Sequence, residues 1–129
     1  MHKLQDLYVR DVMTTGVVTI GEEEAITKAA DKMLKSKIHG LVVLDGSRPS
    51  GLISTFDLLK IVFLKEYSET MSVRNYSSKR TLITTGPDTS LLEAADLMVR
   101  NNIRTLPVVA GERLVGIVSM MDIMKKAIG

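Results

Sequence analysis

The sequence predicts a mixed fold of the α/β (α+β) class, built as two pseudo-symmetric β-α-β-β-α repeats packed sheet to sheet. Three observations predict it. The chain repeats itself at a constant offset of 65 positions, each copy holds an apolar stripe with helical spacing, and each copy holds short apolar runs divided by a glycine turn. One copy alone has too little core to be stable, so the two copies are expected to stack and to leave a cleft between equivalent elements.

The internal repeat is continuous, because residues 19–57 match residues 84–122 without a gap. The matched positions include glycines, an Ala-Ala-Asp run and several aliphatic residues, and chance does not hold one register over so many of them. The sequence therefore predicts repeat one at 9–64 and repeat two at 73–128, which together form one module. The intervening segment 67–80 is rich in Ser, Thr and Asn, which is typical of a loop.

Each copy is expected to open with a strand and a helix. The apolar pairs at 17–18 and 82–83 predict the strands, each ended by a glycine. Apolar residues then recur at i, i+3, i+4 and i+7 from Ile26 and from Leu91, which predicts one amphipathic helix in each copy. Because both stripes contain alanines, another element is expected to pack closely against them.

A hairpin and a second helix complete each copy. Glycines at 46 and 111 mark the hairpin turns, where a positive φ is required. The second helices are expected to begin near Asp57 and Asp122. The predicted hairpin strands are 41–44, 51–54, 106–109 and 114–119.

Composition limits the classes of function. The net charge is +2 and aromatic residues make up 4%, which argues against nucleic-acid binding. The chain has no cysteine and two histidines, His2 and His39, so no disulfide and no zinc or His-based metal site is expected. The most apolar stretch, 58–64, is interrupted by a lysine and is far shorter than the roughly 20 residues that span a bilayer. With no visible secretory signal, we expect a cytoplasmic protein that does not enter the membrane.

Two heptapeptides, 51–57 and 116–122, share the pattern Gly, apolar, apolar, Ser, any, any, Asp. Each ends a predicted strand and opens a predicted helix. A helix N-terminus favours phosphate, a Ser hydroxyl can donate to a phosphate oxygen, and an ionised Asp can accept from both hydroxyls of a ribose. Ordinary helix capping produces the same spacing. Both interpretations, nucleotide contact and helix cap, are open.

These corners and the repeat resemble the tandem cystathionine-β-synthase-type (CBS) repeats of Bateman modules. Further residues typical of that family are Asp-Val-Met-Thr at 11–14, Pro-Asp-Thr-Ser-Leu at 87–91 and Ile-Arg-Thr-Leu-Pro-Val-Val at 103–109. The resemblance covers nearly the whole chain, and the motifs are specific in combination.

The resemblance implies a ligand site and no catalytic residues. In the family the corner Asp holds ribose, the Ser approaches phosphate, the end of the first strand lines the adenine pocket, and basic residues before the second strand face phosphate. The implied ligand is AMP, ADP or ATP, with S-adenosylmethionine as a further candidate, and no metal or other cofactor is implied. The implied ligand-binding residues are Thr19, Ile20, His39, Ser54, Asp57, Thr84, Thr85, Arg104, Thr105, Ser119 and Asp122.

The two copies depart from the family pattern in different ways. Repeat one has His39 where repeat two has Arg104, and it lacks the signature proline. Histidine is mostly neutral at pH 7 whereas arginine is always charged, so we expect two unequal sites with the stronger one in repeat two. Phe56 and Met121 stand where some members carry a second hydroxyl, so one phosphate contact is expected to be missing. The Ser-Ser-Lys-Arg run at 77–80 is a further candidate for charge at a pocket mouth.

The sequence thus predicts a regulatory sensor that binds an adenine nucleotide and acts on an unidentified partner protein. The alternative is a ligand-independent protein-interaction or dimerisation module. A homodimer is expected, because family modules commonly pair through their helices and the stretch 58–64 is apolar. An enzyme is not expected, since His39 has no Ser or Cys partner in a recognisable motif.

Overall fold

The computed structural model describes residues 4–63, 71–76 and 82–129. Leu64 and the Ser-Ser-Lys-Arg run at 77–80 lie outside the described residues. Within the described ranges, no helix combines the length and the apolar character needed to cross a bilayer.

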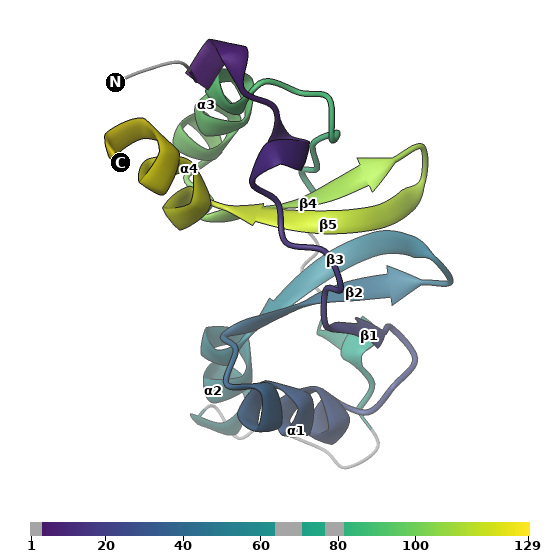
Figure 1. The fold of residues 1–129 in the computed structure, drawn as a ribbon. Helices are drawn as coiled ribbons and strands as arrows, with labels where there is room; N and C mark the ends of the chain where they lie inside the picture. Colours follow the sequence, from purple (N-terminus) through teal and green to yellow (C-terminus); the bar gives the residue numbers. More distant parts are fainter. Residues whose placement is uncertain (1–3, 64–70, 77–81) are drawn as a thin grey trace. The chain divides into compact units, whose positions relative to one another are not determined.

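The chain divides into two compact units that do not follow the two sequence repeats. Val18–Leu82 forms one unit, and Met1–Val17 joins Ile83–Gly129 in the other. Figure 1 shows the second grouping, since the purple N-terminal segment lies against the green helix α3 (Leu91–Asn101). We call these the repeat-one unit and the repeat-two unit.

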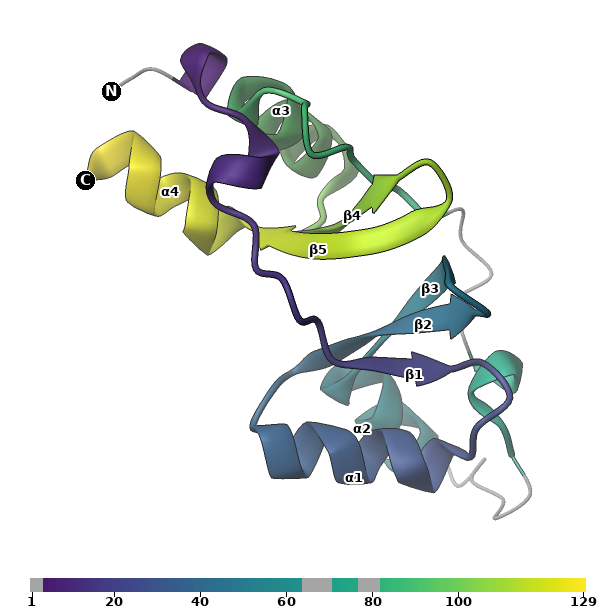
Figure 2. The ribbon, with the colours of Figure 1, turned by 45° about the vertical axis from the view of Figure 1, so that its right-hand side comes forward.

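The repeat-one unit is a three-stranded sheet covered by two helices. Its strands lie in the order β1-β2-β3, with β1 parallel to β2 and β2 antiparallel to β3. Figure 2 shows α1 and α2 on one face of this sheet. The elements are β1 (Thr19–Gly21), α1 (Ile26–Ser36), β2 (Gly40–Asp45), β3 (Arg48–Ser54), α2 (Thr55–Phe63) and the short 3₁₀ helix η3 (Val73–Asn75).

The core of the repeat-one unit lies between the sheet and these helices. Helix α1 buries Ile26, Ala29 and Met33, which belong to the stripe predicted from the sequence. Ala29 is fully buried, so the small side chain lets the helix approach its neighbours closely. Helix α1 ends where Lys37 adopts the left-handed conformation, with φ at 54°. The predicted amphipathic helix is confirmed.

The repeat-two unit has the same plan, except that a single bridge takes the place of the first strand. Strands β4 (Thr105–Ala110) and β5 (Arg113–Ser119) form an antiparallel hairpin, and Thr85 adds one parallel bridge to Val108. Helix α3 buries Leu91, Ala94 and Met98 of the predicted stripe, and Ala95 is half-buried. The remaining helices are α4 (Met120–Ile128) and the short 3₁₀ helices η1 (Leu4–Asp6) and η2 (Val9–Asp11).

The predicted first strand of repeat one was placed two residues too early, and in repeat two a single bridge at Thr85 stands in place of the predicted strand. Residues 17–18 precede β1, and residues 82–83 lie outside any strand. The reason is pairing, because β2 offers Val42–Leu44 as parallel partners and these align with Thr19–Gly21. The predicted hairpin turns are confirmed, with φ at 65° for the glycines at 46 and 111.

Each unit is completed by a segment from the start of the other repeat. In the repeat-two unit, Val9 donates its N–H to the Thr89 carbonyl at 2.8 Å. In the repeat-one unit, Val73 donates its N–H to the Glu24 carbonyl at 2.8 Å. Both valines are fully buried. We call residues 4–14 and 71–76 the exchanged segments, since each supplies a core side chain to the other repeat's unit.

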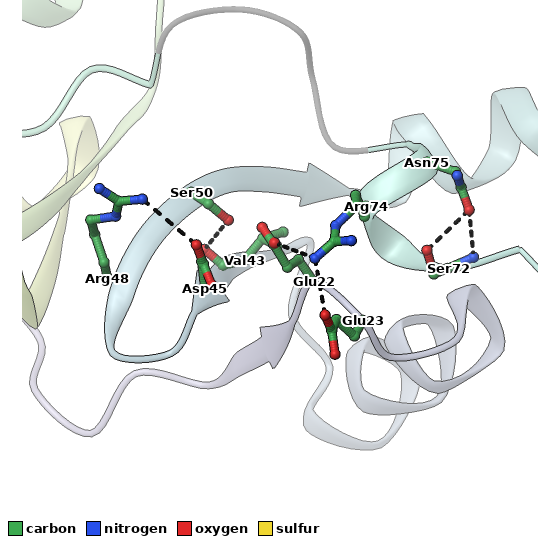
Figure 3. Close-up of polar contacts among 9 residues, drawn as sticks. All are labelled: Glu22, Glu23, Val43, Asp45, Arg48, Ser50, Ser72, Arg74 and Asn75. Carbon is green, nitrogen blue, oxygen red and sulfur yellow. Dashed lines mark hydrogen bonds and ion pairs between the residues drawn. The ribbon is translucent and has the colours of Figure 1, made fainter.

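Ion pairs also hold the exchanged segments against the loops that contain Glu24 and Thr89. Arg74 Nη2 lies 2.8 Å from Glu22 Oε1 and 3.0 Å from Glu23 Oε1, as Figure 3 shows. The hydrogen bond from Arg74 is the main cause that lowers the pKa of Glu22, and the same bond raises the pKa of Arg74. Arg10 forms the equivalent ion pair with Asp88. Because these side chains, apart from that of Glu22, are largely exposed, the pairs orient the segments more than they stabilise them.

Gly116 in β5 lies directly against the N-terminal exchanged segment. Thr14 and Ile117 exchange two backbone hydrogen bonds of 2.8 and 2.9 Å. A Cβ at Gly116 would consequently lie 2.8 Å from Met13 Sδ and 2.9 Å from the Thr14 carbonyl oxygen. The glycine is required by this close approach of another backbone.

We predict that Gly116→Ala lowers the free energy of unfolding by about 1–3 kcal/mol, because the added methyl group overlaps a backbone atom. Gly40→Ala is the control, since its Cβ would meet only the Ile53 carbonyl oxygen at the ordinary distance of 3.5 Å. We expect the control to change stability by no more than about 0.5 kcal/mol. Denaturant unfolding measures both, and equal effects would contradict the packing argument.

Candidate functional site

The two Gly-x-x-Ser-x-x-Asp corners are reciprocal helix caps. Asp57 Oδ2 accepts from the Ser54 N–H at 2.8 Å and from the Ser54 hydroxyl at 2.9 Å, while Ser54 Oγ accepts from the Asp57 N–H at 3.1 Å. Ser119 and Asp122 make the same three bonds at 2.8, 2.9 and 3.2 Å. The capping interpretation of the sequence is therefore confirmed.

Capping leaves one part of each corner available to a ligand. In the described part of the chain, Oδ1 of Asp57 and of Asp122 accepts no hydrogen bond, and an ionised carboxylate has lone pairs to spare. The hydroxyls of Ser54 and Ser119 already donate to the carboxylates. Donation to phosphate would require these hydroxyls to rotate and give up a cap bond. The carboxylate is thus the freer group at each corner.

The backbone holds the predicted basic positions against the corners. The first N–H of α2 donates to the carbonyl of His39, and the first N–H of α4 donates to that of Arg104, each at 2.9 Å. Thr105 is paired with Ser119 across the hairpin. Both His39 and Arg104 are exposed. The structure therefore brings His39 to the corner of repeat one, and Arg104 with Thr105 to the corner of repeat two.

The predicted adenine-pocket residues lie on strand edges. Thr85 exchanges two hydrogen bonds, of 3.0 and 2.8 Å, with the backbone of β4. Because backbone groups alternate in direction along a strand, the Thr84 carbonyl and the Gly86 N–H point away from β4. In β1 the Thr19 carbonyl and the Gly21 N–H point away from β2 for the same reason. We call these two acceptor–donor pairs the outer edges of repeat two and repeat one.

The outer edge of repeat two is open. Among the described residues, the Thr84 carbonyl accepts no hydrogen bond, and the Gly86 N–H has only a long bond of 3.3 Å to Thr89 Oγ1. Thr85 is 6% exposed, and its Oγ1 has no hydrogen-bond partner within the described part of the chain. A shallow depression of about 540 Å³ lies at this edge. Its lining residues are Thr84, Thr85, Gly86, Thr89, Glu93, Leu97 and Val109.

The outer edge of repeat one is filled by side chains. Lys32 Nζ donates to the Thr19 carbonyl at 2.7 Å, and the Gly21 N–H donates to Glu24 Oε2 at 2.8 Å. The hydrogen bond from Lys28, and next that from Gly21, lower the pKa of Glu24, so the carboxylate that accepts from Gly21 stays ionised. Ile20, beside these groups, is fully buried.

Sequence reasoning missed Lys32 and Glu24. The usable signal was a mismatch in the repeat alignment, since position 32 is Lys where position 97 is Leu, and position 24 is Glu where position 89 is Thr. The positions that match between the repeats define the fold that both share, whereas the polar groups at the two outer edges differ at positions that do not match. No group of three or more His, Cys, Asp or Glu side chains that could hold a metal ion occurs in the ranges that the structure describes.

Each repeat has backbone or carboxylate groups that could bind a ligand at two places, but at the first of them only repeat two leaves these groups open, since Lys32 and Glu24 occupy them in repeat one. One is the outer edge on the first strand, and the other is the Asp corner at the end of β3 or β5. In the repeat-one unit these places lie on either side of β2, about 10 Å apart at the usual strand spacing. Such an arrangement suits an elongated polar ligand.

Comparison with known sequences identifies a family. The model of the CBS domain family matches residues 9–64 and 73–129. The protein MJ1404 of Methanocaldococcus jannaschii is 34% identical over 137 residues, which cover 95% of this chain and 32% of that protein. MJ1225 of the same organism is 32% identical over 118 residues, which cover 91% of this chain and 41% of that protein. The chain therefore spans less than half the length of these relatives.

Comparison with solved structures gives the same fold. The CBS domain pair of MJ0100, in complex with 5′-methylthioadenosine and S-adenosyl-L-methionine, has a TM-score of 0.81 and 26% identity over 93% of this chain and 94% of its own. CBSX2 in complex with AMP has a TM-score of 0.81 and 26% identity over 94% of this chain and 96% of its own. The predicted α+β class is confirmed.

Proposed function

Since the chain belongs to the CBS domain family, we propose that it is a regulatory module that binds an adenine nucleotide and whose bound state is read by an effector protein. The ligands of the similar CBSX2 and MJ0100 structures all contain adenosine or its 5′-thio derivative. The observation that carries the proposal is the open outer edge of repeat two. It lies in the same unit as a corner whose Asp122 carboxylate keeps a free oxygen.

Adenine matches the chemistry of the outer edge. The base carries an amino donor next to a ring-nitrogen acceptor, and the edge of repeat two presents the Thr84 carbonyl and the Gly86 N–H in complementary order. A base without the amino donor would leave the Thr84 carbonyl unpaired, which costs binding free energy.

The corner of repeat two matches the sugar and phosphate. Asp122 Oδ1 is free to accept from ribose hydroxyls while Oδ2 keeps the cap. Arg104 stands beside the corner with an exposed, permanently charged side chain, and the N-terminus of α4 also favours negative charge. Repeat one has only His39 at the equivalent place, so phosphate is expected to prefer repeat two.

We also propose that the module is a homodimer that pairs through its helices. Three apolar side chains of α2 are widely exposed, namely Leu59 at 67%, Val62 at 64% and Phe63 at 79%. Exposed apolar side chains gathered on one helix indicate an interface. Sedimentation equilibrium is expected to give twice the mass of the chain for the natural sequence and the mass of a monomer for Leu59→Glu. A natural sequence that sediments as a monomer would contradict this proposal.

A thermal-shift screen tests nucleotide binding. We expect AMP, ADP, ATP or S-adenosylmethionine to raise the melting temperature, with stabilisation growing as RT ln(1 + [L]/Kd). GTP serves as the control, because guanine has a carbonyl oxygen where adenine has the amino donor. No shift with any adenine ligand at millimolar concentration would support the alternative of a ligand-independent interaction module.

Asp122→Asn separates ligand contact from capping. The amide oxygen of Asn can still accept from the Ser119 N–H, so we expect little change in melting temperature, whereas the charged acceptor for ribose is lost. Nucleotide affinity is expected to fall by about 1.5–3 kcal/mol. Asp96→Asn, on the exposed face of α3 and paired with Arg100, is the matched control and is expected to keep the affinity. Unchanged affinity in a well-folded Asp122→Asn variant would contradict the proposal that the Asp122 carboxylate binds ribose.

A further inference from the structure

We propose that Lys32 and Glu24 close the outer edge of repeat one, so that one adenine nucleotide binds per chain, at the outer edge of repeat two. This inference rests on the proposed function and adds to it the number of sites and the residues that decide it.

Repeat one uses its own side chains where a base would bind. The Lys32 ammonium occupies the Thr19 carbonyl at 2.7 Å, where the amino group of adenine would donate. The Glu24 carboxylate occupies the Gly21 N–H at 2.8 Å, where a ring nitrogen would accept. Side chains of repeat one itself therefore occupy both the carbonyl acceptor and the N–H donor that a base would need.

These internal bonds are difficult for a neutral base to displace. Each one joins a charged group to the backbone, and such bonds are shorter and stronger than those between neutral groups. Glu24 is also held by Lys28 Nζ, which lies 2.7 Å from its Oε1. A base that broke one charge-assisted bond without replacing the charge would lose about tenfold or more in affinity.

Repeat two carries the opposite chemistry at the matching positions. Leu97 stands where Lys32 stands in repeat one, and an aliphatic side chain cannot donate to the Thr84 carbonyl. Thr89 stands where Glu24 stands, and its neutral hydroxyl lies 3.3 Å from the Gly86 N–H, a longer bond than that of Glu24. The base can therefore take both backbone groups of this edge without displacing a charged side chain.

The competing explanation is that Lys32 only fastens α1 to β1. In that case its removal would cost stability and leave the number of sites unchanged. Replacing Lys32 and Glu24 with the residues found at the matching positions of repeat two distinguishes the two explanations. Only our proposal, that these side chains close the edge, predicts that the replacement opens a second site.

The test is a calorimetric titration with AMP. We expect the natural sequence to bind about one AMP per chain, and Lys32→Leu combined with Glu24→Thr to bind about two. Lys35→Leu is the matched control, since it removes an exposed lysine one turn along α1 that pairs with Asp31, and it is expected to keep one site. Melting temperatures establish that each variant is folded.

The reverse exchange tests repeat two. Leu97→Lys is expected to place an ammonium at the Thr84 carbonyl and to weaken AMP binding at least tenfold in a folded protein. Two equal sites in the natural sequence, or one unchanged site in the Lys32→Leu, Glu24→Thr variant, would overturn the inference and leave the proposed function standing. If the natural sequence bound no AMP or other adenine ligand, the proposed function and this inference would fall together.

Discussion

The exchange of short segments between the repeats is the constraint on which the rest of the structure depends. Val9 and Val73 each begin one repeat and are buried in the unit of the other. Their N–H groups dock on the carbonyls of Thr89 and Glu24 at the same distance of 2.8 Å. Neither sequence repeat therefore contains a complete core, and the smallest unit that can fold with its core filled needs parts of both.

The two loops that accept hydrogen bonds from the exchanged segments also form part of the outer edges. The Glu24 carbonyl receives the exchanged segment while its carboxylate holds the Gly21 N–H. The Thr89 carbonyl receives the other segment while its hydroxyl lies near the Gly86 N–H. One residue in each loop thus joins core packing to the edge where we propose that a base binds.

Much of this fold could be predicted from the sequence because its signals are local. The stripes of α1 and α3, the glycine turns and the Ser–Asp caps all depend on residues within a few positions of one another. The exchange could not be predicted in this way, because Val9 and Val73 meet partners that are remote in the sequence. The one trace of it is that Val-Arg recurs at 9–10 and 73–74 with an offset of 64, one less than that of the repeat. The packing of one repeat's sheet on the other stays a prediction.

The candidate site divides in the same way between what is local and what is not. The corners were found because Ser and Asp lie three positions apart, and capping alone explains that spacing, so the pattern could not decide the function. The role of Lys32 could not be predicted, because this residue lies in α1 and its ammonium reaches the Thr19 carbonyl only in the folded chain. The two repeats share the residues that the fold needs, and they differ in the side chains at their outer edges.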